Sequence, residues 1–398
     1  MSMSNPKSAG PPLEIIGDAA GCLAIPLAGT ALFQWDYDTH DEQLLNLYVR
    51  GKQRQWDADS RLDWSHQPDP ADPLGMPDHF LWIAGSALWD RLPDREKVRV
   101  RRHTAGWMYS QFLHAEQFAL LGVGKIAQTV PDMDAKLYAA TQLMDEARHA
   151  EAFNRYISTK IGVRYPISAS LGSLFDQIMR ESRWDFACIA GHIVIENMGL
   201  AAFGQQRDQL RDPFARAFAT YVAQDEARHV AFGRIMLRRY YPELSEAELA
   251  EREEFALEAC WALRDRFVGE EMWEALDYGI EQCLAIARWS PAQREFRRRL
   301  FMRVVPALRD IGLFGPRMQD GLAKMGVLGF IRIDDEETRR RDELVAEELT
   351  RQELAERKEN IDATVSLGAG DPGAPPAGRE HLLARGNDHP GPPMGQPS

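Results

Sequence analysis

The pentapeptide Asp-Glu-Ala-Arg-His occurs twice in this chain, at residues 145–149 and 225–229. In each copy the glutamate and the histidine are three positions apart, so on an α-helix both side chains lie on one face. Carboxylate and neutral imidazole groups together suit iron or manganese better than metals that prefer thiolates. The repeat therefore predicts two equivalent helices that each contribute a carboxylate and an imidazole to a metal site.

Two further glutamates stand at matching positions before the two copies. Glu116 precedes Glu146 by 30 residues, and Glu196 precedes Glu226 by the same 30. Apolar residues surround both at helical spacing, and a carboxylate on an apolar core face costs several kcal/mol unless it is paired or bound to a cation. Two divalent cations would neutralise the four glutamates, which are also the predicted catalytic groups. The predicted metal ligands are Glu116, Glu146, His149, Glu196, Glu226 and His229, with His192 as a candidate extra ligand.

The 30-residue intervals also predict how the chain turns between the glutamates. Pro131 lies at the midpoint of the first interval, and Pro213 lies beside the midpoint of the second. Proline and aspartate are typical of turns and helix starts. Each half is therefore predicted to be an antiparallel helix hairpin, with both glutamates at one level about 20 Å from the bend.

Apolar residues at helical spacing cover most of the chain. Alternating patterns typical of paired strands are nearly missing. The predicted helices are an early one from Asp41 and those at 94–127, 133–160, 171–204, 213–241, 245–278, 291–312 and 335–357. The predicted fold class is all-α, with a four-helix metal-binding bundle and additional helices.

The composition of successive segments predicts the domain organisation. Residues 1–40, rich in Gly, Pro and Ala, are predicted to be an irregular N-terminal arm, and residues 41–330 to be the helical domain, with the metal-binding bundle at about 95–240. Residues 331–360 are predicted to be a charged C-terminal helix. Residues 361–398 contain few large apolar groups, so burial could not offset the entropy of ordering them, and a disordered tail is expected.

Composition also narrows the function classes. The chain has 398 residues, and a net charge of −13 disfavours nucleic acid or an anionic membrane as the main partner. There is neither a signal-peptide pattern nor an apolar run of the ~18 residues that a membrane span needs. The four cysteines form no CxxC pair, so neither a zinc site nor a disulfide framework is predicted. The expected location is the cytoplasm.

The ligand pattern resembles the ferritin-like superfamily of di-iron oxidases and oxygenases over about residues 95–240. This superfamily includes monooxygenase hydroxylases, acyl-carrier-protein desaturases, arylamine N-oxygenases and the ribonucleotide reductase small subunit. The resemblance implies a non-haem di-iron oxidoreductase, a monooxygenase or oxidase that activates O2 and hydroxylates, N-oxygenates or desaturates a small organic metabolite. The implied cofactor is two iron ions, with an iron and manganese pair as the alternative. An iron-handling ferroxidase and a ribonucleotide reductase small subunit-like oxidase are the alternative functions.

Three positions depart from particular members of the superfamily. Phe153 stands where the ribonucleotide reductase small subunit has its radical tyrosine, which disfavours that function. Val222 stands where arylamine N-oxygenases carry an extra ligand histidine. The threonine that hydroxylases and desaturases often have after the third glutamate is missing after Glu196.

Further groups are expected around the metals. Asp145 and Asp225 are expected to accept the free N–H of the ligand histidines, with Arg148 and Arg228 beside them. An apolar pocket is expected to suit an aromatic, fatty or carrier-bound substrate. Its predicted lining is Phe112, Leu113, Leu120, Phe153, Ile193, Leu200 and Phe203.

The chain offers no electron carrier of its own. It has no GxGxxG fingerprint for a nicotinamide or flavin, and its scattered cysteines do not make an iron–sulfur cluster. An external donor, either a ferredoxin or a reductase, is therefore expected. The acidic composition favours a donor with a basic docking patch. The sequence leaves a homodimer open.

Overall fold

The structure is a computed structural model, which describes residues 11–17, 24–265 and 267–334, and then 336–338, 340–342, 344–345, 348 and 351. The chain divides into two compact units, Met1–Ala346 and Glu347–Ser398. All of the helices and strands named below lie in the first unit. Apart from two strands of two residues each, all of these elements are helices, which confirms the predicted all-α fold class.

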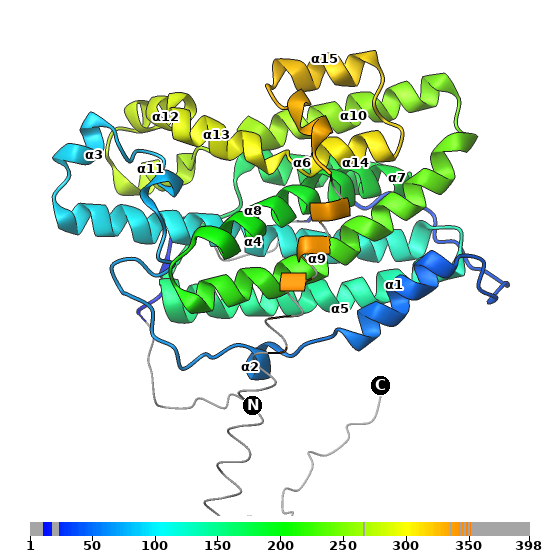
Figure 1. The fold of residues 1–398 in the computed structure, drawn as a ribbon, viewed down its shortest axis with the longest axis horizontal. Helices are drawn as coiled ribbons and strands as arrows, with labels where there is room; N and C mark the ends of the chain where they lie inside the picture. Colours follow the sequence, from blue (N-terminus) through cyan, green and yellow to red (C-terminus); the bar gives the residue numbers. More distant parts are fainter. Residues whose placement is uncertain are drawn as a thin grey trace, which may run out of the picture. The chain divides into compact units, whose positions relative to one another are not determined.

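Four long helical segments form the centre of the first unit (Figure 1). Two antiparallel pairs make up this bundle, because α4 packs along α5 and α8 packs along α9, while α5 also contacts α9. The third segment is one continuous helix with a π-helical stretch, η3, in its middle. The segments are α4 (Asp94–Thr129), α5 (Met133–Tyr156), α7 (Trp184–Cys188) with η3 (Ile189–Ile195) and α8 (Glu196–Gln209), and α9 (Pro213–Tyr240).

The two hairpins turn in the same way. Residues 130–132 join α4 to α5, and residues 210–212 join α8 to α9. The Asp132 side chain accepts the Ala135 N–H, and Asp212 accepts the Ala215 N–H. A carboxylate therefore caps the N-terminus of each returning helix, where it satisfies a free N–H and meets the positive end of the helix dipole. The two predicted bends are confirmed.

Additional helices cover the bundle. The helix α1 (Glu42–Gln53) contacts α5 and α9, whereas α10 (Glu246–Asp265) contacts η3 and α6. Figure 1 shows α1 and the group from α10 to α15 on different sides of the four central helices. The remaining elements are α2 (Ala58–Arg61), η1 (Asp78–Phe80), α3 (Ala87–Arg91), η2 (Ile157–Ile161), α6 (Ala169–Arg180), η4 (Tyr241–Glu243), α11 (Glu270–Leu276), α12 (Ile280–Trp289), α13 (Pro291–Leu300), α14 (Val304–Asp310), α15 (Pro316–Lys324) and η5 (Leu328–Arg332).

The prediction of one helix over 171–204 is wrong, because α6 ends at Arg180 and α7 begins at Trp184. The buried ammonium group of Lys125 on α4 explains the break. It donates hydrogen bonds to the carbonyl oxygens of Ile178 and Met179, at 2.9 and 3.2 Å, and to that of Glu181. These carbonyls are therefore satisfied by a side chain from another helix, and α6 can end inside the protein.

Two more predicted helices are divided. The pattern over 245–278 becomes α10 and α11, and Gly269 precedes α11 with a left-handed φ of 68° that suits glycine. The pattern over 291–312 becomes α13 and α14, and α12 was not predicted.

The regions at both ends of the helical domain contain little regular structure that can be compared with the predictions. Among the described residues before Asp41, only β1 (Glu14–Ile15) is regular, and it pairs in parallel with β2 (Val163–Arg164). The described residues between 336 and 351 are helical, within the predicted 335–357 helix. The predicted tail at 361–398 lies outside the described residues.

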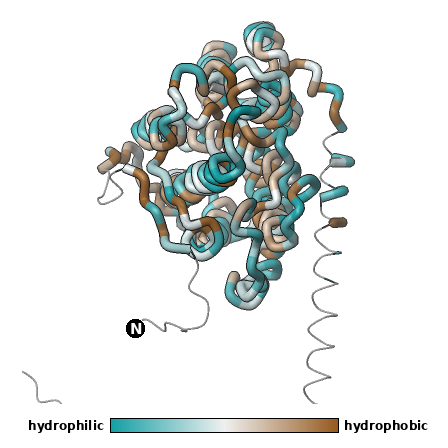
Figure 2. The backbone as a smooth tube through the Cα atoms, turned by 90° about the vertical axis from the view of Figure 1, so that its left-hand side faces the viewer, coloured by the Kyte–Doolittle hydropathy of each residue, from teal (hydrophilic) through white to brown (hydrophobic). Residues whose placement is uncertain are grey.

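One described helical stretch, Trp184–Gln209, is long and apolar enough to cross a membrane by length and composition. Within the protein 83% of its most apolar window is buried. Figure 2 shows hydrophobic and hydrophilic residues mixed along the helices. The stretch is therefore accounted for as a central helix of the bundle.

The helix α9 approaches η3 very closely at Gly233. A Cβ atom built at this position would lie 2.3 Å from Cβ and 2.8 Å from Cγ of His192. Such distances are far inside van der Waals contact, so only glycine fits unless the two helices separate. The close approach fixes the distance between the helices that carry Glu196 and Glu226.

We predict that Gly233→Ala destabilises the protein, because overpacking of a core costs about 1–3 kcal/mol. Thermal melting monitored by circular dichroism should show a clear fall in the melting temperature. Gly191→Ala is the matched control, since nothing lies within 4 Å of a Cβ built there. Equal melting temperatures for both variants would contradict the prediction.

Candidate metal centre

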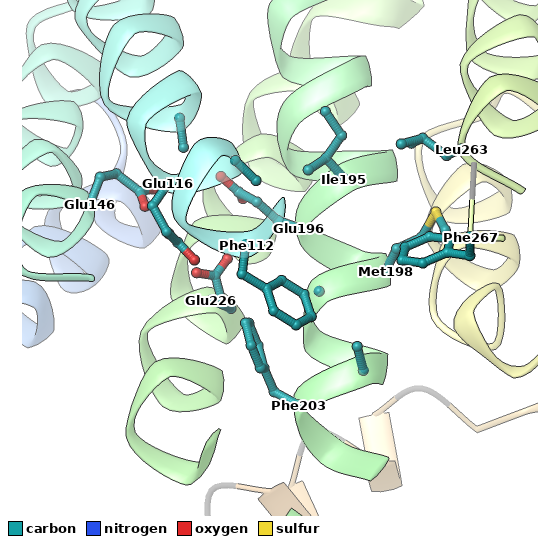
Figure 3. Close-up of a pocket in the computed structure, with 14 residues that line it drawn as sticks. Phe112, Glu116, Glu146, Ile195, Glu196, Met198, Phe203, Glu226, Leu263 and Phe267 are labelled. Carbon is teal, nitrogen blue, oxygen red and sulfur yellow. The ribbon is translucent and has the colours of Figure 1, made fainter. Parts of the chain in front are cut away.

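The six predicted ligands come from all four bundle segments. Glu116 lies on α4, Glu146 and His149 on α5, Glu196 at the start of α8, and Glu226 and His229 on α9. All six are buried, with at most 7% of any one residue exposed. Figure 3 shows the four glutamate carboxylates directed toward one another.

The ligand atoms form two groups that could each hold a metal ion. The first group comprises Glu116, Glu146, His149 and Glu226, and the second comprises Glu146, Glu196 and His229. Within each group the candidate ligand atoms lie within 4.8 Å of one another. Because Glu146 belongs to both groups, the arrangement suits two neighbouring ions that share a carboxylate.

The distances from the histidine Nδ1 atoms to the glutamate oxygens show which carboxylates lie between the two histidines and which lie beside one of them. His149 Nδ1 lies 3.6 Å from Glu146 Oε2 and 3.4 Å from Glu226 Oε1. His229 Nδ1 lies 3.2 Å from Glu146 Oε1 and 3.6 Å from Glu226 Oε2. Glu146 and Glu226 therefore stand between the two histidines and could bridge two ions. Glu116 lies on the His149 side, with its Oε2 3.2 Å from His149 Nδ1.

Burial strongly disfavours the charged forms of the glutamates and histidines in this cluster. It raises the pKa of Glu116 to about 8 and that of Glu196 well above its usual value. Burial opposes charge on His149 and His229 as well, but the surrounding carboxylates outweigh it and raise the pKa of both. Without a cation, protons on these glutamates and histidines offset the negative charge of the cluster. Two divalent cations would replace those protons.

Several buried polar atoms fit this interpretation. Glu146 Oε2, Glu196 Oε2 and His229 Nδ1 have no hydrogen-bond partner among the described residues. Buried polar atoms without partners are rare in folded proteins and call for an explanation. These three belong to the second metal group, where a bound cation would satisfy all of them. The residues present therefore fit a two-metal centre.

The aspartate of each copy of the repeat forms a hydrogen bond with the histidine of the other copy. His149 Nε2 lies 3.0 Å from Asp225 Oδ2, and His229 Nε2 lies 3.2 Å from Asp145 Oδ2. Each aspartate thus accepts the Nε2–H of the histidine in the opposite copy. This leaves Nδ1 of both rings facing the glutamates, which is the orientation that metal binding requires.

Two buried arginines complete this crossed arrangement. Arg148 Nη2 lies 2.7 Å from Asp225 Oδ2, and Arg228 Nη2 lies 3.2 Å from Asp145 Oδ2. Each arginine also pairs with the aspartate of its own copy. Burial alone would raise the pKa of Asp225, but Arg228 and His149 hold it well below its usual value. Both aspartates therefore remain ionised and keep accepting from the imidazoles.

Sequence analysis missed three residues that support the site. Gln55 Nε2 donates to Asp145 Oδ1 at 2.7 Å, and Trp56 Nε1 donates to Asp225 Oδ2 at 2.7 Å. Both follow α1, far from the repeat in sequence, so no local pattern indicates them. Gln142 Nε2 donates to Glu146 Oε1 at 2.9 Å and to Glu196 Oε1 at 3.0 Å. Its position one turn before Glu146, on the same helix face, was a usable signal.

The candidate extra ligand His192 does not belong to either group. Its Nε2 lies 3.1 Å from Gln142 Oε1 and 4.0 Å from Glu196 Oε1. Burial lowers its pKa to about 3, so the ring is neutral at physiological pH. His192 therefore donates to Gln142, which in turn donates to the two glutamates.

A narrow apolar cavity of about 50 Å³ adjoins the carboxylates (Figure 3). Small residues on α4 and α8, namely Ala115, Ala119, Gly199 and Ala202, leave this space open. Its other lining residues are Phe112, Glu116, Glu146, Ile195, Glu196, Met198, Phe203, Glu226, Leu263 and Phe267.

The predicted pocket lining needs correction. Only Phe112 and Phe203 of the seven predicted residues line the cavity. The other five, Leu113, Leu120, Phe153, Ile193 and Leu200, do not line it. Phe153, for example, is fully buried against Tyr109 and Phe218 between the helices. Large residues at such positions fill space, whereas the cavity opens where the helices carry alanine and glycine. Leu263 and Phe267 come from the α10 end, outside the bundle.

The fold and the cluster define a helical protein with a dinuclear carboxylate and histidine site. The chain matches the family model of P-aminobenzoate N-oxygenase AurF over residues 38–312. The chain therefore belongs to this family. A search of curated proteins finds no match.

Solved structures of R2-like ligand-binding oxidases are similar at a low level. A variant with a non-activated Mn/Mn cofactor is 16% identical, with 70% of this chain and 96% of that chain covered and a TM-score of 0.42. A form obtained after photoconversion is 14% identical, with the same coverage and a TM-score of 0.43.

Family membership confirms the predicted class, a non-haem di-iron oxidoreductase that acts as an oxygenase or oxidase on a small molecule. It favours this function over the iron-handling and ribonucleotide reductase-like alternatives. The position of the extra family histidine is filled here by Val222, which is fully buried.

We predict that iron-reconstituted protein binds about two metal ions per chain, because the ligands form two groups. His149→Ala and His229→Ala should each lose metal, since each removes one imidazole from one group. Elemental analysis after desalting measures the stoichiometry. His114→Ala is the matched control, because this α4 histidine bonds to the Tyr165 carbonyl oxygen and belongs to neither group. Wild-type metal content in both histidine variants would refute the assignment.

We further predict that Gln142 orients Glu146 and Glu196. Gln142→Leu removes both donated hydrogen bonds and should weaken metal binding about 10–100-fold, as is typical for groups that orient ligands. Competition with a chromophoric chelator measures the affinity. Gln206→Leu is the control, because Gln206 is similarly buried on α8 but its carbonyl oxygen accepts from Tyr109. An unchanged affinity in Gln142→Leu would show that the amide has no positioning role.

Proposed function

We propose that this protein is a di-iron N-oxygenase that converts a small, uncharged aromatic amine to its hydroxylamine. The single observation that carries the proposal is the family match over residues 38–312, which includes all six candidate ligands. The geometry supports it, since an apolar cavity opens directly onto the four glutamates.

The cavity lining argues for the substrate class. Phe112, Phe203 and Phe267 supply aromatic surface against which a single ring could pack. None of the described lining residues is Lys, Arg or His. A substrate carboxylate would therefore lose its hydration without gaining a cationic partner, at a cost of several kcal/mol. An uncharged aniline avoids this cost.

In this proposal the chain's residues hold and shield the reacting groups. The four glutamates and two histidines would bind the metals, and the iron ions, when bound, supply the redox chemistry with O2. Asp145 and Asp225 keep the imidazole Nδ1 atoms directed at the metals. The apolar walls exclude water and hold the amine nitrogen beside the carboxylates.

The reaction consumes O2, two electrons and two protons for each amine, and it releases water with the hydroxylamine. Since the chain supplies no electron carrier that we recognise, we propose an external donor protein, either a ferredoxin or a reductase. We also propose a cytoplasmic location, where the buried thiols of Cys188, Cys260 and Cys283 would remain reduced. Cell fractionation with a specific antibody would test the location.

A single-turnover experiment tests the activity. Chemically reduced, iron-loaded protein is mixed with ¹⁸O2 and either 4-methylaniline or p-aminobenzoate, which differ mainly in the charge of one substituent. Mass spectrometry should show the gain of one labelled oxygen, with more product from the uncharged amine. Zinc-loaded protein, which cannot change oxidation state, is the control.

A cavity variant separates substrate binding from metal binding. Ala202→Leu should fill the cavity and abolish product while iron content stays normal, whereas Gly204→Ala, on the same helix and with nothing within 4 Å of the added Cβ, should retain activity. The proposal fails if no amine on the panel gains oxygen. Formation of a ferric mineral alone would instead favour iron handling.

A further inference from the structure

An arginine-rich pocket lies among the helices outside the bundle, in a chain whose net charge is −13. It has a volume of about 520 Å³, and α12, α13, α15 and the α10 end contribute its walls. Figure 1 shows these helices grouped on one side of the bundle. Among the described residues its lining includes six cations and no carboxylate: Arg264, Arg288, Arg294, Arg297, Arg298 and Lys324.

The cations fall into two groups by their partners. Arg298 pairs with Glu295, and Lys324 pairs with Asp320. Buried Arg297 donates to the carbonyl oxygens of Ala287 and Arg288 at 2.8 Å and so holds the α12 end in place. By contrast, the Arg288 and Arg294 side chains have no acidic partner among the described residues. They remain available for an anion from outside the protein.

The shape of the pocket favours a small molecule over a protein surface. Its volume falls in the range of about 300–1,000 Å³ that is typical of ligand sites. Arginine guanidinium groups bind phosphate oxygens through paired hydrogen bonds. Trp289 also lines the pocket, and 73% of it is exposed, so its indole face can stack on a flat ring.

We propose that this pocket binds a nucleoside diphosphate or a molecule with the same diphosphate and aromatic groups. Arg288 and Arg294 contact the phosphates, and Trp289 stacks on the base. Arg297 acts only as a positioning residue. The proposal does not rest on the proposed amine oxygenation, because the pocket is separate from the metal-binding residues.

The pocket is nevertheless a neighbour of the metal-side cavity. Arg264 and Val268 line the arginine-rich pocket, while Leu263 and Phe267 line the cavity beside the glutamates. Neighbouring residues in the sequence thus line both spaces. A molecule bound to the arginines would rest against the outer side of the cavity wall.

Isothermal titration of the full-length protein with ADP, inorganic pyrophosphate and adenosine tests the proposal. ADP should bind one to one, pyrophosphate more weakly, and adenosine not measurably. The double variant Arg288→Glu with Arg294→Glu should lose at least about tenfold in ADP affinity, since it removes two charged hydrogen-bond donors and places two negative charges beside the phosphates. Trp289→Ala should weaken ADP binding but leave pyrophosphate binding unchanged.

The control variant is Arg309→Glu, which changes an exposed arginine on α14 that does not line the pocket. All of the altered residues are exposed, and thermal melting is used to check that each variant is folded. The proposal is overturned if ADP does not bind at low ionic strength, or if the control weakens it as much as the double variant. It is also overturned if ADP does not bind and an acidic electron-transfer protein does so through Arg288 and Arg294.

Discussion

The burial of four glutamates at the centre of a helical bundle is the constraint on which the rest of this structure depends. Each carboxylate is almost fully removed from water, and burial raises the pKa of Glu116 to about 8. Such a cluster is stable only if cations, protons or charged hydrogen bonds compensate it. The histidines, the aspartates and the arginines of the repeat all serve this compensation, and the unpartnered carboxylate oxygens indicate where metal ions complete it.

The crossed pairing of the two repeats joins the hairpins into one site. Asp225 holds His149, and Asp145 holds His229, so neither hairpin carries a complete set of contacts by itself. The π-helical η3 immediately precedes Glu196, and π-helical turns are frequent at functional sites. Because Gly233 lets α9 approach η3 at His192, the two halves meet at a fixed distance.

How much could be predicted from the sequence depends on whether a feature repeats at helical spacing. The two copies of the pentapeptide, the glutamates 30 residues earlier and the capped turns at Asp132 and Asp212 are all local patterns. They are sufficient to predict the two hairpins and to select the six candidate ligands that the structure brings together. Gln55 and Trp56 could not be predicted, because only the folded path of α1 brings them to the aspartates.

The cavity and the helix breaks were predicted poorly for a related reason. Helical spacing in the sequence picks out large apolar residues, but the cavity lies where Ala115, Gly199 and Ala202 leave space that no side chain fills. The end of α6 depends on Lys125, which is more than 50 residues away and reaches its carbonyls through the core. Both features arise from tertiary contacts, which no window of sequence contains.

Local charge in this protein differs sharply from its net charge. The acidic composition favours a docking partner with a basic patch, yet the described lining of the arginine-rich pocket has six cations and no carboxylate. The cavity beside the carboxylate cluster has the opposite character, since the only charged residues in its described lining are the glutamates themselves. Leu263 and Phe267 line one space, and their neighbours Arg264 and Val268 line the other. An uncharged substrate and an anionic ligand could therefore occupy neighbouring spaces without competing, because each space excludes the other's chemistry.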